Sequence, residues 1–383
     1  MTKTASSSLA SRVFATLRPF LLGLTIFFLL YAFICGINVM GGGLKILANC
    51  PVTSSMIAGL FARASHPVAG LFVGVLITSL VQSSSFTTAI TVSMVGSGLL
   101  PVSHAIPIVM GANIGTSVTN TLVSMAHISA RLEYRRAFGA AIVDDIFNLL
   151  NVAILLPIEI KTGLLRKTAT ALASVFVHPT VEKPDSPLKA ATKPVVSAIE
   201  HLLGGPLHLA TEWVGTAMAV IGLVGLLVSL ILLVRALKAV MLARLEAFFG
   251  RYFFRNWLAG LLLGAMLTAV IQSSSVTTSL IVPLAAAGVL RLTQLFPYVL
   301  GANIGTTVTA LIAAAANPAG LAVAFAHLLF NLIGTCIFLP LRFIPIRMAD
   351  WFARLVAVRR GLAIVYIVVV FFLLPILCII VLS

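Results

Sequence analysis

The chain has 383 residues, of which 60% are hydrophobic and only 9% are charged. Soluble domains carry about 25% charged residues, so this composition excludes a soluble globular protein and predicts a membrane protein. At about 20 apolar residues per crossing, the chain can supply roughly eight or more membrane-spanning segments. The net charge of +15 would suggest a nucleic-acid partner in a soluble chain. In a membrane protein it indicates basic cytoplasmic loops instead.

The sequence contains no motif for ATP hydrolysis or zinc chemistry, such as GxxxxGK[ST] or HExxH. Its cysteines lie far apart and form no CxxC pair, so we interpret them as packing residues. They are Cys35, Cys50, Cys336 and Cys378. We therefore expect neither an enzyme nor a resident cofactor, and no nucleic-acid partner.

Residues 1–18 contain three basic side chains and are predicted to form a cytoplasmic N-terminus. The apolar run that follows extends from Phe20 to about Met40. The core of a signal peptide has about 7–15 apolar residues, so this longer run predicts a membrane-spanning helix.

An internal repeat organises most of the chain. Two blocks recur at an offset of 190 positions and a third recurs at an offset of 183, always in the same order. The blocks are AGLFVGVLITSLVQSSSFTT (69–88) and AGLLLGAMLTAVIQSSSVTT (259–278), GANIGTSVT (111–119) and GANIGTTVT (301–309), and DDIFNLL (144–150) and HLLFNLI (327–333). Such self-similarity predicts two structural repeats, over residues 19–158 and 213–341.

Charge indicates how the repeats lie in the membrane. Three segments carry an excess of basic residues and are placed in the cytoplasm: 131–136, 235–255 and 342–360. Residues 159–212 are polar and nearly balanced in charge, so we expect an extracytoplasmic loop there, whose prolines favour flexible chain over helices. The last segment, 342–383, combines a basic cytoplasmic stretch with a final spanning helix over Leu362–Leu382, which would place the C-terminus outside.

With these placements, the motifs of the first repeat run from outside to inside, and those of the second run from inside to outside. Inverted repeats with polar interruptions at matching places are typical of secondary transporters, whose binding sites lie near the bilayer midplane. We therefore predict an all-α polytopic membrane protein with two inverted-topology repeats, in which broken or re-entrant helical hairpins meet at the midplane.

The two QSSS segments, at 82–85 and 272–275, interrupt strongly apolar runs and are followed by paired threonines. In hydrocarbon an unsatisfied polar group is costly, so polar backbone is tolerated only inside the protein or along a cavity. A single Ser or Thr in a membrane helix commonly bonds back to its own helix, but two matching copies favour a binding site. Helix N-termini and hydroxyls can hold an anion, while amide, hydroxyl and carbonyl oxygens suit a small cation.

Two further motifs, GANIGT at 111–116 and 301–306, place glycines around an asparagine. We predict a second backbone break at each copy, which would let the chain approach a ligand closely. The alternative is tight packing of helices through small residues. No Lys or Arg lies within any of these motifs, so a divalent anion bound there would need co-bound cations. Obligate cotransport follows as a hypothesis.

Asp144 and Asp145 are the only acidic residues that we place within a membrane span. Carboxylates inside a membrane are functional candidates by default, here for ion or proton coupling. They lie only eight residues or so beyond Arg136, so pairing with a basic residue near the interface is the alternative.

The doubled QSSS segments, GANIGTSVTN, GANIGTTVTA, RRAFGAAIVDDIFN and AHLLFN together resemble the type II sodium-dependent phosphate cotransporters, most closely their short bacterial members. The resemblance implies that the two QSSS segments face one another, each within a helical hairpin, and form the phosphate and sodium sites. The implied phosphate-binding residues are Gln82, Ser83, Ser84, Ser85, Gln272, Ser273, Ser274 and Ser275. The implied sodium or structural candidates are Gln82, Ser85, Thr87, Thr88, Asn113, Thr116, Gln272, Ser275, Thr277, Thr278, Asn303 and Thr306.

The chain also departs from the family's vertebrate members. The pair Asp144-Asp145 stands where they commonly have His-Asp, and no aspartate precedes Asp144, whereas electrogenic members carry one upstream of the first QSSS. Against this background the resemblance implies electroneutral transport, most simply a pair of sodium ions with one divalent phosphate. The loop between the repeats has no cysteine, so the vertebrate loop's disulfide is not expected.

The predicted function is import of inorganic phosphate down a sodium gradient by alternating access. The expected partners are phosphate, sodium and membrane lipid, with no cofactor beyond the co-transported ion. We place the protein in the bacterial inner membrane, with its N-terminus in the cytoplasm and its C-terminus in the periplasm. A sodium-coupled transporter of another oxyanion, a passive anion channel, and a phosphate sensor that binds without transport are the alternatives. The sequence does not predict an oligomeric state.

Overall fold

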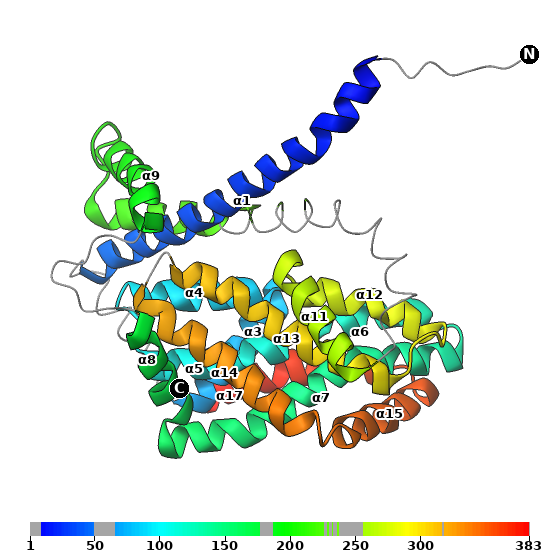
Figure 1. Ribbon diagram of the computed structural model, residues 1–383. Helices are drawn as coiled ribbons and strands as arrows, with labels where there is room; N and C mark the ends of the chain where they lie inside the picture. The colour runs from blue at the N-terminus through cyan, green and yellow to red at the C-terminus, as the bar shows by residue number, and fades with distance from the viewer. Residues whose placement is uncertain are drawn as a thin grey trace, which may run out of the picture.

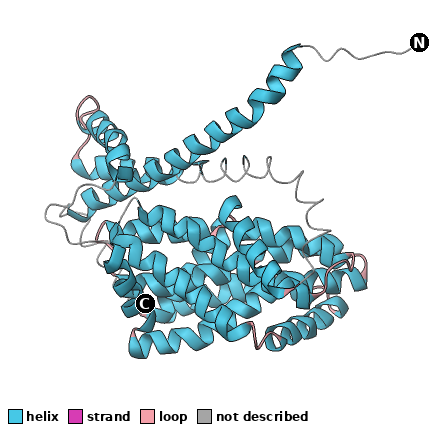
Figure 2. Ribbon diagram, in the orientation of Figure 1, coloured by secondary structure: helices cyan, strands magenta, loops and turns pink. Residues whose placement is uncertain are grey.

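The computed structural model describes residues 9–49, 66–176, 187–225, 256–315 and 318–382, together with residues 228, 229, 232 and 236. All regular structure in these ranges is helical and none of it is strand, as Figure 2 shows. The expected all-α fold is thereby confirmed. The basic segment expected at 235–255 lies outside the described residues apart from Ala236, as do Cys50 and residues 1–8.

Within the described residues, five helical segments are long and apolar enough to cross a membrane. They are Gly23–Met40, Arg131–Thr162, Leu292–Ala315, Leu321–Phe338 and Leu362–Leu382. Several shorter apolar helices accompany them, including one at Thr211–Gly225. The chain is therefore a multi-pass membrane protein, as its composition predicts.

The first half of the chain contains the first QSSS hairpin and the first GANIGT helix, followed by a long central helix. Its elements are α1 (Leu9–Asn49), α3 (Pro67–Val81), α4 (Ser84–Gly96), α5 (Val102–Gly115), α6 (Val118–Ser124), η1 (Met125–His127) and α7 (Arg131–Thr162). Two helices of the polar stretch follow, α8 (Leu164–Phe176) and α9 (Pro187–Gly204).

The second half repeats the hairpin and the GANIGT helix, and then adds helices towards the C-terminus. Its elements are α11 (Trp257–Ile271), α12 (Ser274–Ala286), α13 (Leu292–Ala315), η2 (Pro318–Gly320), α14 (Leu321–Phe338), α15 (Phe343–Val358), α16 (Leu362–Val368), the π-helical turn η3 (Val369–Leu373) and α17 (Leu374–Leu382). In Figure 1 the hairpins, α7, α13 and α14 form one bundle, and α1 crosses above it beside α9.

The helices α8 and α9 correct the expectation of flexible chain between the repeats for residues 164–176 and 187–204, while residues 177–186 lie outside the described ranges. Proline is tolerated in the first turn of a helix, and Pro187 opens α9. In α8, the buried residues Leu165, Ala169 and Ala173 recur every four positions, so one face packs on the bundle, where α8 contacts α14. Tertiary packing therefore decides this stretch rather than its proline content.

The GANIGT glycines pair helices instead of breaking them. Helix α5 packs along α3, and α13 packs along α11. A β-carbon on Gly111 would overlap the carbonyl oxygen of Leu71, and one on Gly301 would overlap that of Leu261, so only glycine permits these approaches. Small residues at such crossings let backbones come close in a membrane.

The predicted backbone break at GANIGT is therefore wrong for the second copy, whereas in the first copy a break is present at the end of the motif. Helix α13 passes through 301–306 without interruption, and α5 continues to Gly115. In the first copy the chain leaves the helix only at Thr116 and Ser117, after the glycines. Packing against the paired helix stabilises regular backbone at residues whose local preference leaves it free to bend.

Buried apolar side chains form separate cores around the two hairpins. Helix α12 belongs to a cluster with α7, α11 and α15, and α4 belongs to a cluster with α1 and α5. Helix α13 contributes to both clusters, through Phe296 in the first and Ala313 in the second. Phe147 of α7 is fully buried between Phe296 and Phe338, with ring centroids 6.2 and 5.9 Å away. The hairpins are thus held by helices from both halves of the chain.

Candidate functional site

Each QSSS segment breaks a hairpin at the same residue. Helix α3 ends at Val81, Gln82 takes a left-handed conformation with φ 58°, and α4 begins at Ser84. Gln272 has φ 59° between α11 and α12. The interruption that the sequence predicts is present in both copies, with matching backbone geometry.

A left-handed glutamine is unusual, because glycine adopts this conformation without a steric penalty. Among the described residues, Gln82, Gln272 and His208 are the non-glycine residues with positive φ. Each glutamine N–H donates to the threonine carbonyl four positions earlier, Thr78 or Thr268, at 2.7 Å. The presence of a strained glutamine in both copies indicates that its side chain is needed.

The amide side chains of these glutamines are fixed by their surroundings. Thr119 donates to Gln82 Oε1 at 2.6 Å, and Thr309 donates to Gln272 Oε1 at 2.7 Å. The Nε2 groups donate to backbone carbonyls one helical turn back, those of Ser79 and Ala269. Sequence analysis did not single out Thr119 or Thr309, although both lie in the repeated GANIGT block at the same offset as the glutamines.

The serines after each glutamine cap the second hairpin helix. Ser83 accepts from Phe86 N at 3.2 Å, and Ser273 accepts from Val276 N at 3.4 Å. These hydroxyls satisfy one of the free N–H groups of the first helical turn. The remaining N–H groups give the starts of α4 and α12 a partial positive charge, which favours an anion.

The first threonine of each QSSSxTT motif ties its hairpin together. Thr78 donates to Thr87 Oγ1 at 2.7 Å, and the hydroxyls of Thr268 and Thr277 are 2.8 Å apart. Both pairs join the two helices of one hairpin across the break. These four threonines are at most 2% exposed, so the bonds are shielded from water.

The two QSSS segments come together in space, as the resemblance implies. Ser85 Oγ donates to the backbone carbonyl of Gln272 at 3.2 Å, which joins the first motif to the second. Four serines of the motifs are buried: Ser84, Ser85, Ser274 and Ser275. The site is therefore a buried, hydroxyl-rich junction between two helix N-termini.

One set of hydrogen bonds across this junction has no counterpart at the repeat-related positions. Asn120 Nδ2 donates to Thr278 Oγ1 at 2.8 Å, and its Oδ1 accepts from Ser279 Oγ at 2.9 Å. The repeat-related position of Asn120 is Ala310, which cannot hydrogen-bond. Accordingly, the hydroxyl of Thr88, the counterpart of Thr278, is buried without a hydrogen-bond partner among the described residues. The two halves of the site are chemically unequal.

The GANIGT asparagines also connect the two halves. Asn113 Oδ1 lies 3.2 Å from His327 Nε2, and Asn303 Nδ2 donates to Asp144 Oδ1 at 2.6 Å. Asp144 and His327 occupy equivalent places in the shared block, so each asparagine contacts the same position of the opposite repeat. Asn148 Nδ2 also donates to Asp144 Oδ1, at 3.0 Å. His327 was missed by sequence analysis, although its alignment with Asp144 pointed to it.

Asp145 lies beside Asp144 but faces a different helix. Its Oδ2 accepts from the hydroxyl of Tyr366 at 3.0 Å. Both aspartates are at most 1% exposed, and neither forms an ion pair with a basic residue in the part of the chain that is described. Within the described residues, the alternative that these aspartates pair with a basic residue near the interface is therefore wrong. A role of Asp144 and Asp145 in ion or proton coupling stays a prediction.

Two sodium candidates bond back to their own helices. Thr116 Oγ1 donates to the carbonyl of Ala112 at 3.0 Å, and Thr306 Oγ1 donates to that of Ala302 at 2.9 Å. This is the common behaviour of a threonine in a membrane helix. Their hydrogen bonds are accounted for by the helix, and any role in sodium binding stays a prediction.

The fold and the site define a polytopic helical membrane protein whose polar centre is buried where two repeated broken hairpins meet. A family model described as Na+/Pi-cotransporter matches residues 32–165 and 226–371. The chain belongs to this family, and the expected membership of the type II sodium-dependent phosphate cotransporters is confirmed.

Known relatives agree with this assignment. Sodium-dependent phosphate transport protein 2A of Mus musculus is 36% identical over an alignment 420 positions long, which includes 90% of this chain. Sodium-dependent phosphate transport protein 2B of Homo sapiens is 32% identical over an alignment 440 positions long, which again includes 90% of this chain. The chain spans 65% and 63% of the lengths of these two relatives. No solved structure matches the chain.

Proposed function

We propose that this protein imports inorganic phosphate together with sodium by alternating access, and that the paired QSSS segments form the site. The relatives are named sodium-dependent phosphate transport proteins, and the chain resembles them over 90% of its own length. No resident cofactor takes part, and sodium is the co-transported ion.

The observation that carries this proposal is the junction of the two breaks, where Ser85 bonds to Gln272. Helices α4 and α12 both begin there, so two positive helix ends meet at buried motifs that contain no Lys or Arg. Backbone N–H groups and serine hydroxyls provide donors for phosphate oxygens. Discontinuous helices that direct their N-termini at an anion are the usual substrate site of secondary transporters.

Sodium binding is proposed beside the phosphate, at oxygens that the hairpins already orient. The fixed amide oxygens of Gln82 and Gln272 and the unpartnered hydroxyl of Thr88 are suitable ligands for a small hard cation. A cation there offsets the charge of a divalent anion, so each ion strengthens binding of the other. Coupling then requires no basic side chain in the site.

An inverted arrangement of the repeats is supported by contacts at the two ends of α7. Gly288, in the turn before α13, lies against Arg136 near the start of α7. Helix α5 of the first repeat instead contacts α8, which follows the end of α7. Because α7 has 32 residues and can cross a membrane, the equivalent hairpins then approach the site from opposite sides. Such symmetry suits alternating access.

The test is uptake of radiolabelled phosphate into proteoliposomes under an inward sodium gradient, compared with an equal potassium gradient. Ser84→Ala and Ser274→Ala should each abolish most of the sodium-dependent uptake, because each removes a buried hydroxyl at the junction. Ser174→Ala, an exposed serine on α8, is the matched control and should transport normally. Thermal stability of each variant distinguishes a lost site from a lost fold.

Other outcomes would favour the other candidates. Sodium-independent uptake would indicate a passive anion channel, and stronger inhibition by sulfate than by unlabelled phosphate would indicate another oxyanion. Saturable phosphate binding without uptake would indicate a sensor. Normal uptake in both serine variants would refute the proposed site.

We further propose that transport is electroneutral, with a pair of sodium ions for each divalent phosphate, in a bacterial inner membrane with the N-terminus in the cytoplasm and the C-terminus in the periplasm. Uptake at a fixed sodium gradient should then be unchanged when valinomycin and potassium set an inside-negative potential. A clear acceleration by that potential would contradict electroneutrality without contradicting sodium coupling.

A further inference from the structure

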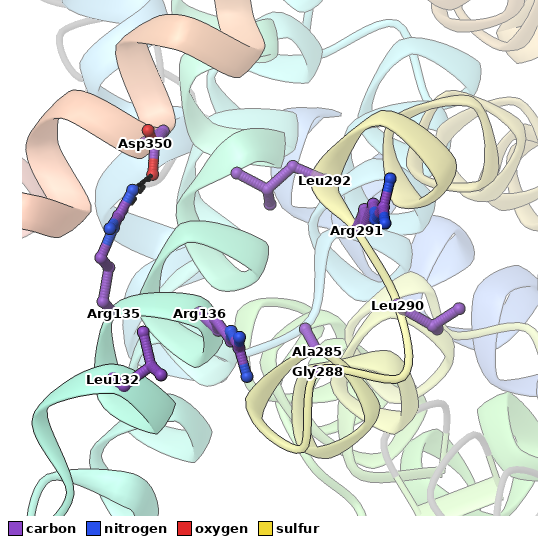
Figure 3. A pocket seen from close by; sticks show the side chains of 9 residues that line it. All are labelled: Leu132, Arg135, Arg136, Ala285, Gly288, Leu290, Arg291, Leu292 and Asp350. Atoms are coloured by element: carbon purple, nitrogen blue, oxygen red, sulfur yellow. Dashed lines mark hydrogen bonds and ion pairs between the residues drawn. The ribbon is translucent and has the colours of Figure 1, made fainter.

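A second polar region lies away from the QSSS hairpins, at the end of the bundle where α7 begins. A cavity of about 430 Å³ opens there between α7, the α12–α13 turn and α15 (Figure 3). Its lining includes three arginines, Arg135, Arg136 and Arg291, but only one acidic residue, Asp350. The walls between them are apolar and include Leu132 and Leu292.

The single acid in this cavity is already neutralised. Arg135 Nη2 donates to Asp350 Oδ1 at 2.7 Å, and Arg354 Nη2 donates to Oδ2 at 2.6 Å. Burial raises the pKa of Asp350, but the hydrogen bonds and charges of the two arginines outweigh burial and hold this pKa below its ordinary value. Both carboxylate oxygens are engaged, so Asp350 does not compensate the other arginines.

Arg136 and Arg291 remain uncompensated. Neither side chain forms an ion pair with any residue in the described ranges. Both lie near a helix N-terminus, since Arg136 is in the second turn of α7 and Arg291 directly precedes α13. Helix N-termini favour anions and disfavour cations, so two arginines at this place create a strong positive potential. An anion in the cavity would offset it.

The region around both arginines is structurally defined. The Arg136 guanidinium lies against Gly288, where φ is +76° and a β-carbon would lie 2.5 Å from Nη1. Glycine is therefore needed at this turn both for its backbone conformation and for the space that Arg136 occupies. At the start of α13, Gln294 Oε1 accepts from the backbone N–H of Arg291 at 3.0 Å and fixes the backbone that carries this arginine.

We propose that this cavity binds a phosphate group through Arg136 and Arg291, either the headgroup phosphate of an anionic membrane lipid or inorganic phosphate. The planar guanidinium forms paired hydrogen bonds with phosphate oxygens. Basic pockets between membrane helices on the cytoplasmic side are typical sites for anionic headgroups. Trp351, which follows Asp350 on α15, is 67% exposed, as expected of a side chain at the membrane surface. The proposal stands independently of the QSSS site.

The lipid source is tested with the full chain in phosphatidylcholine nanodiscs, by titration with phosphatidylglycerol that carries a fluorescent acyl tail. Arg136→Gln/Arg291→Gln should weaken binding by at least about tenfold, because it removes two charge-assisted contacts. Arg342→Gln/Arg359→Gln removes the same charge from exposed arginines outside the cavity and should bind normally. Leu132→Trp, which keeps every charge but fills the cavity, should also weaken binding.

The inorganic source is tested by binding of radiolabelled orthophosphate in sodium-free buffer to the Ser84→Ala/Ser274→Ala protein, which isolates this cavity from the QSSS site. Loss of orthophosphate binding in Arg136→Gln/Arg291→Gln, without an effect on the lipid, would assign inorganic phosphate as the ligand. Equal losses in the two arginine pairs would mean attraction to surface charge and would overturn the proposal. So would unchanged binding of both probes in Arg136→Gln/Arg291→Gln.

Discussion

The hydrogen bond between Thr309 and Gln272 allows the proposed site to be tested one atom at a time. Thr309→Val removes the hydroxyl that donates to Gln272 Oε1 and changes the side-chain shape very little. Thr309 is 1% exposed, so water has little access to replace the lost donor. A buried acceptor left without a donor costs about 1–3 kcal/mol. Thr309 holds Oε1 in the orientation proposed for sodium binding, so we expect this free energy to be lost from sodium binding when the amide turns away. The loss corresponds to about a 5- to 150-fold increase in the sodium concentration needed for half-maximal phosphate uptake.

The repeat provides an internal comparison for this prediction. Thr119→Val removes the equivalent donor to Gln82, but Thr119 and Gln82 are both partly exposed. Water can replace the donor there, so the effect should fall at the lower end of the range. Thr309→Ser keeps the hydroxyl and should stay close to the native protein.

The assay is a sodium titration of phosphate uptake in proteoliposomes, with Thr162→Val as the control. The exposed Thr162 hydroxyl donates to the carbonyl of Ile158 and accepts from the backbone N–H of Leu164, and neither partner belongs to the proposed site, so this variant should show the native sodium dependence. Native sodium dependence in Thr309→Val would refute the reasoning. A larger effect in Thr119→Val than in Thr309→Val would refute the part that rests on burial.

Three further outcomes are expected. Gly301→Ala forces a methyl group against the Leu261 carbonyl, and overpacking of this kind costs about 1–3 kcal/mol, so the melting temperature of this variant should fall. Gly361→Ala is the control, because a methyl group there enters open space and should leave the melting temperature unchanged. Asp144→Ala leaves the buried amide of Asn303 without its acceptor and should also lower the melting temperature, and no change would contradict the importance of that contact. The pKa of Asp350 is lower in the folded protein than in the unfolded chain, where it is about 4. The ion pairs of Asp350 therefore stabilise the fold fully above the unfolded-state pKa, and this stabilisation is lost as the pH falls through the folded-state pKa. The difference in melting temperature between native protein and Asp350→Asn should therefore shrink on acidification below that range, and a difference that grows would contradict the ion pair.

The breaks at QSSS could be predicted from the sequence because the physical constraint is local. Four consecutive polar residues in an apolar run must be satisfied inside the protein, and their recurrence at a fixed offset excludes coincidence. The structure places the break at the glutamine in both copies, at Gln82 and Gln272. The same logic predicted helices for the apolar runs and a multi-pass chain.

The GANIGT motifs could not be resolved in the same way. Glycine permits both a break and a close helix crossing, and nothing within the six residues distinguishes them. The decision lies in the partner helix, since Gly301 packs on Leu261, which is far away in the chain. The helices α8 and α9 escaped prediction for the same reason, because packing with α14 and α1 stabilises them.

Contacts across the junction were also beyond sequence analysis. Asn120 and Thr278 are 158 residues apart, and Asn113 and His327 are 214 apart. Periodicity does not reveal such pairs, because they depend on how the two repeats are docked. The repeat alignment nevertheless contained a usable signal for His327, which stands where the first repeat has Asp144.

The inequality between Asn120 and Ala310 bears on the energetics of a transport cycle. If the two halves alternate by exchanging shapes, a perfectly duplicated chain would spend equal time open to either side. Here the first half can make a contact to Thr278 that the second half cannot return to Thr88. One resting state would then be preferred before any ion binds, by the free energy of that contact. The gradients alone would still set the direction of net transport, while the Asn120 amide would set how the unloaded protein divides its time between the two states.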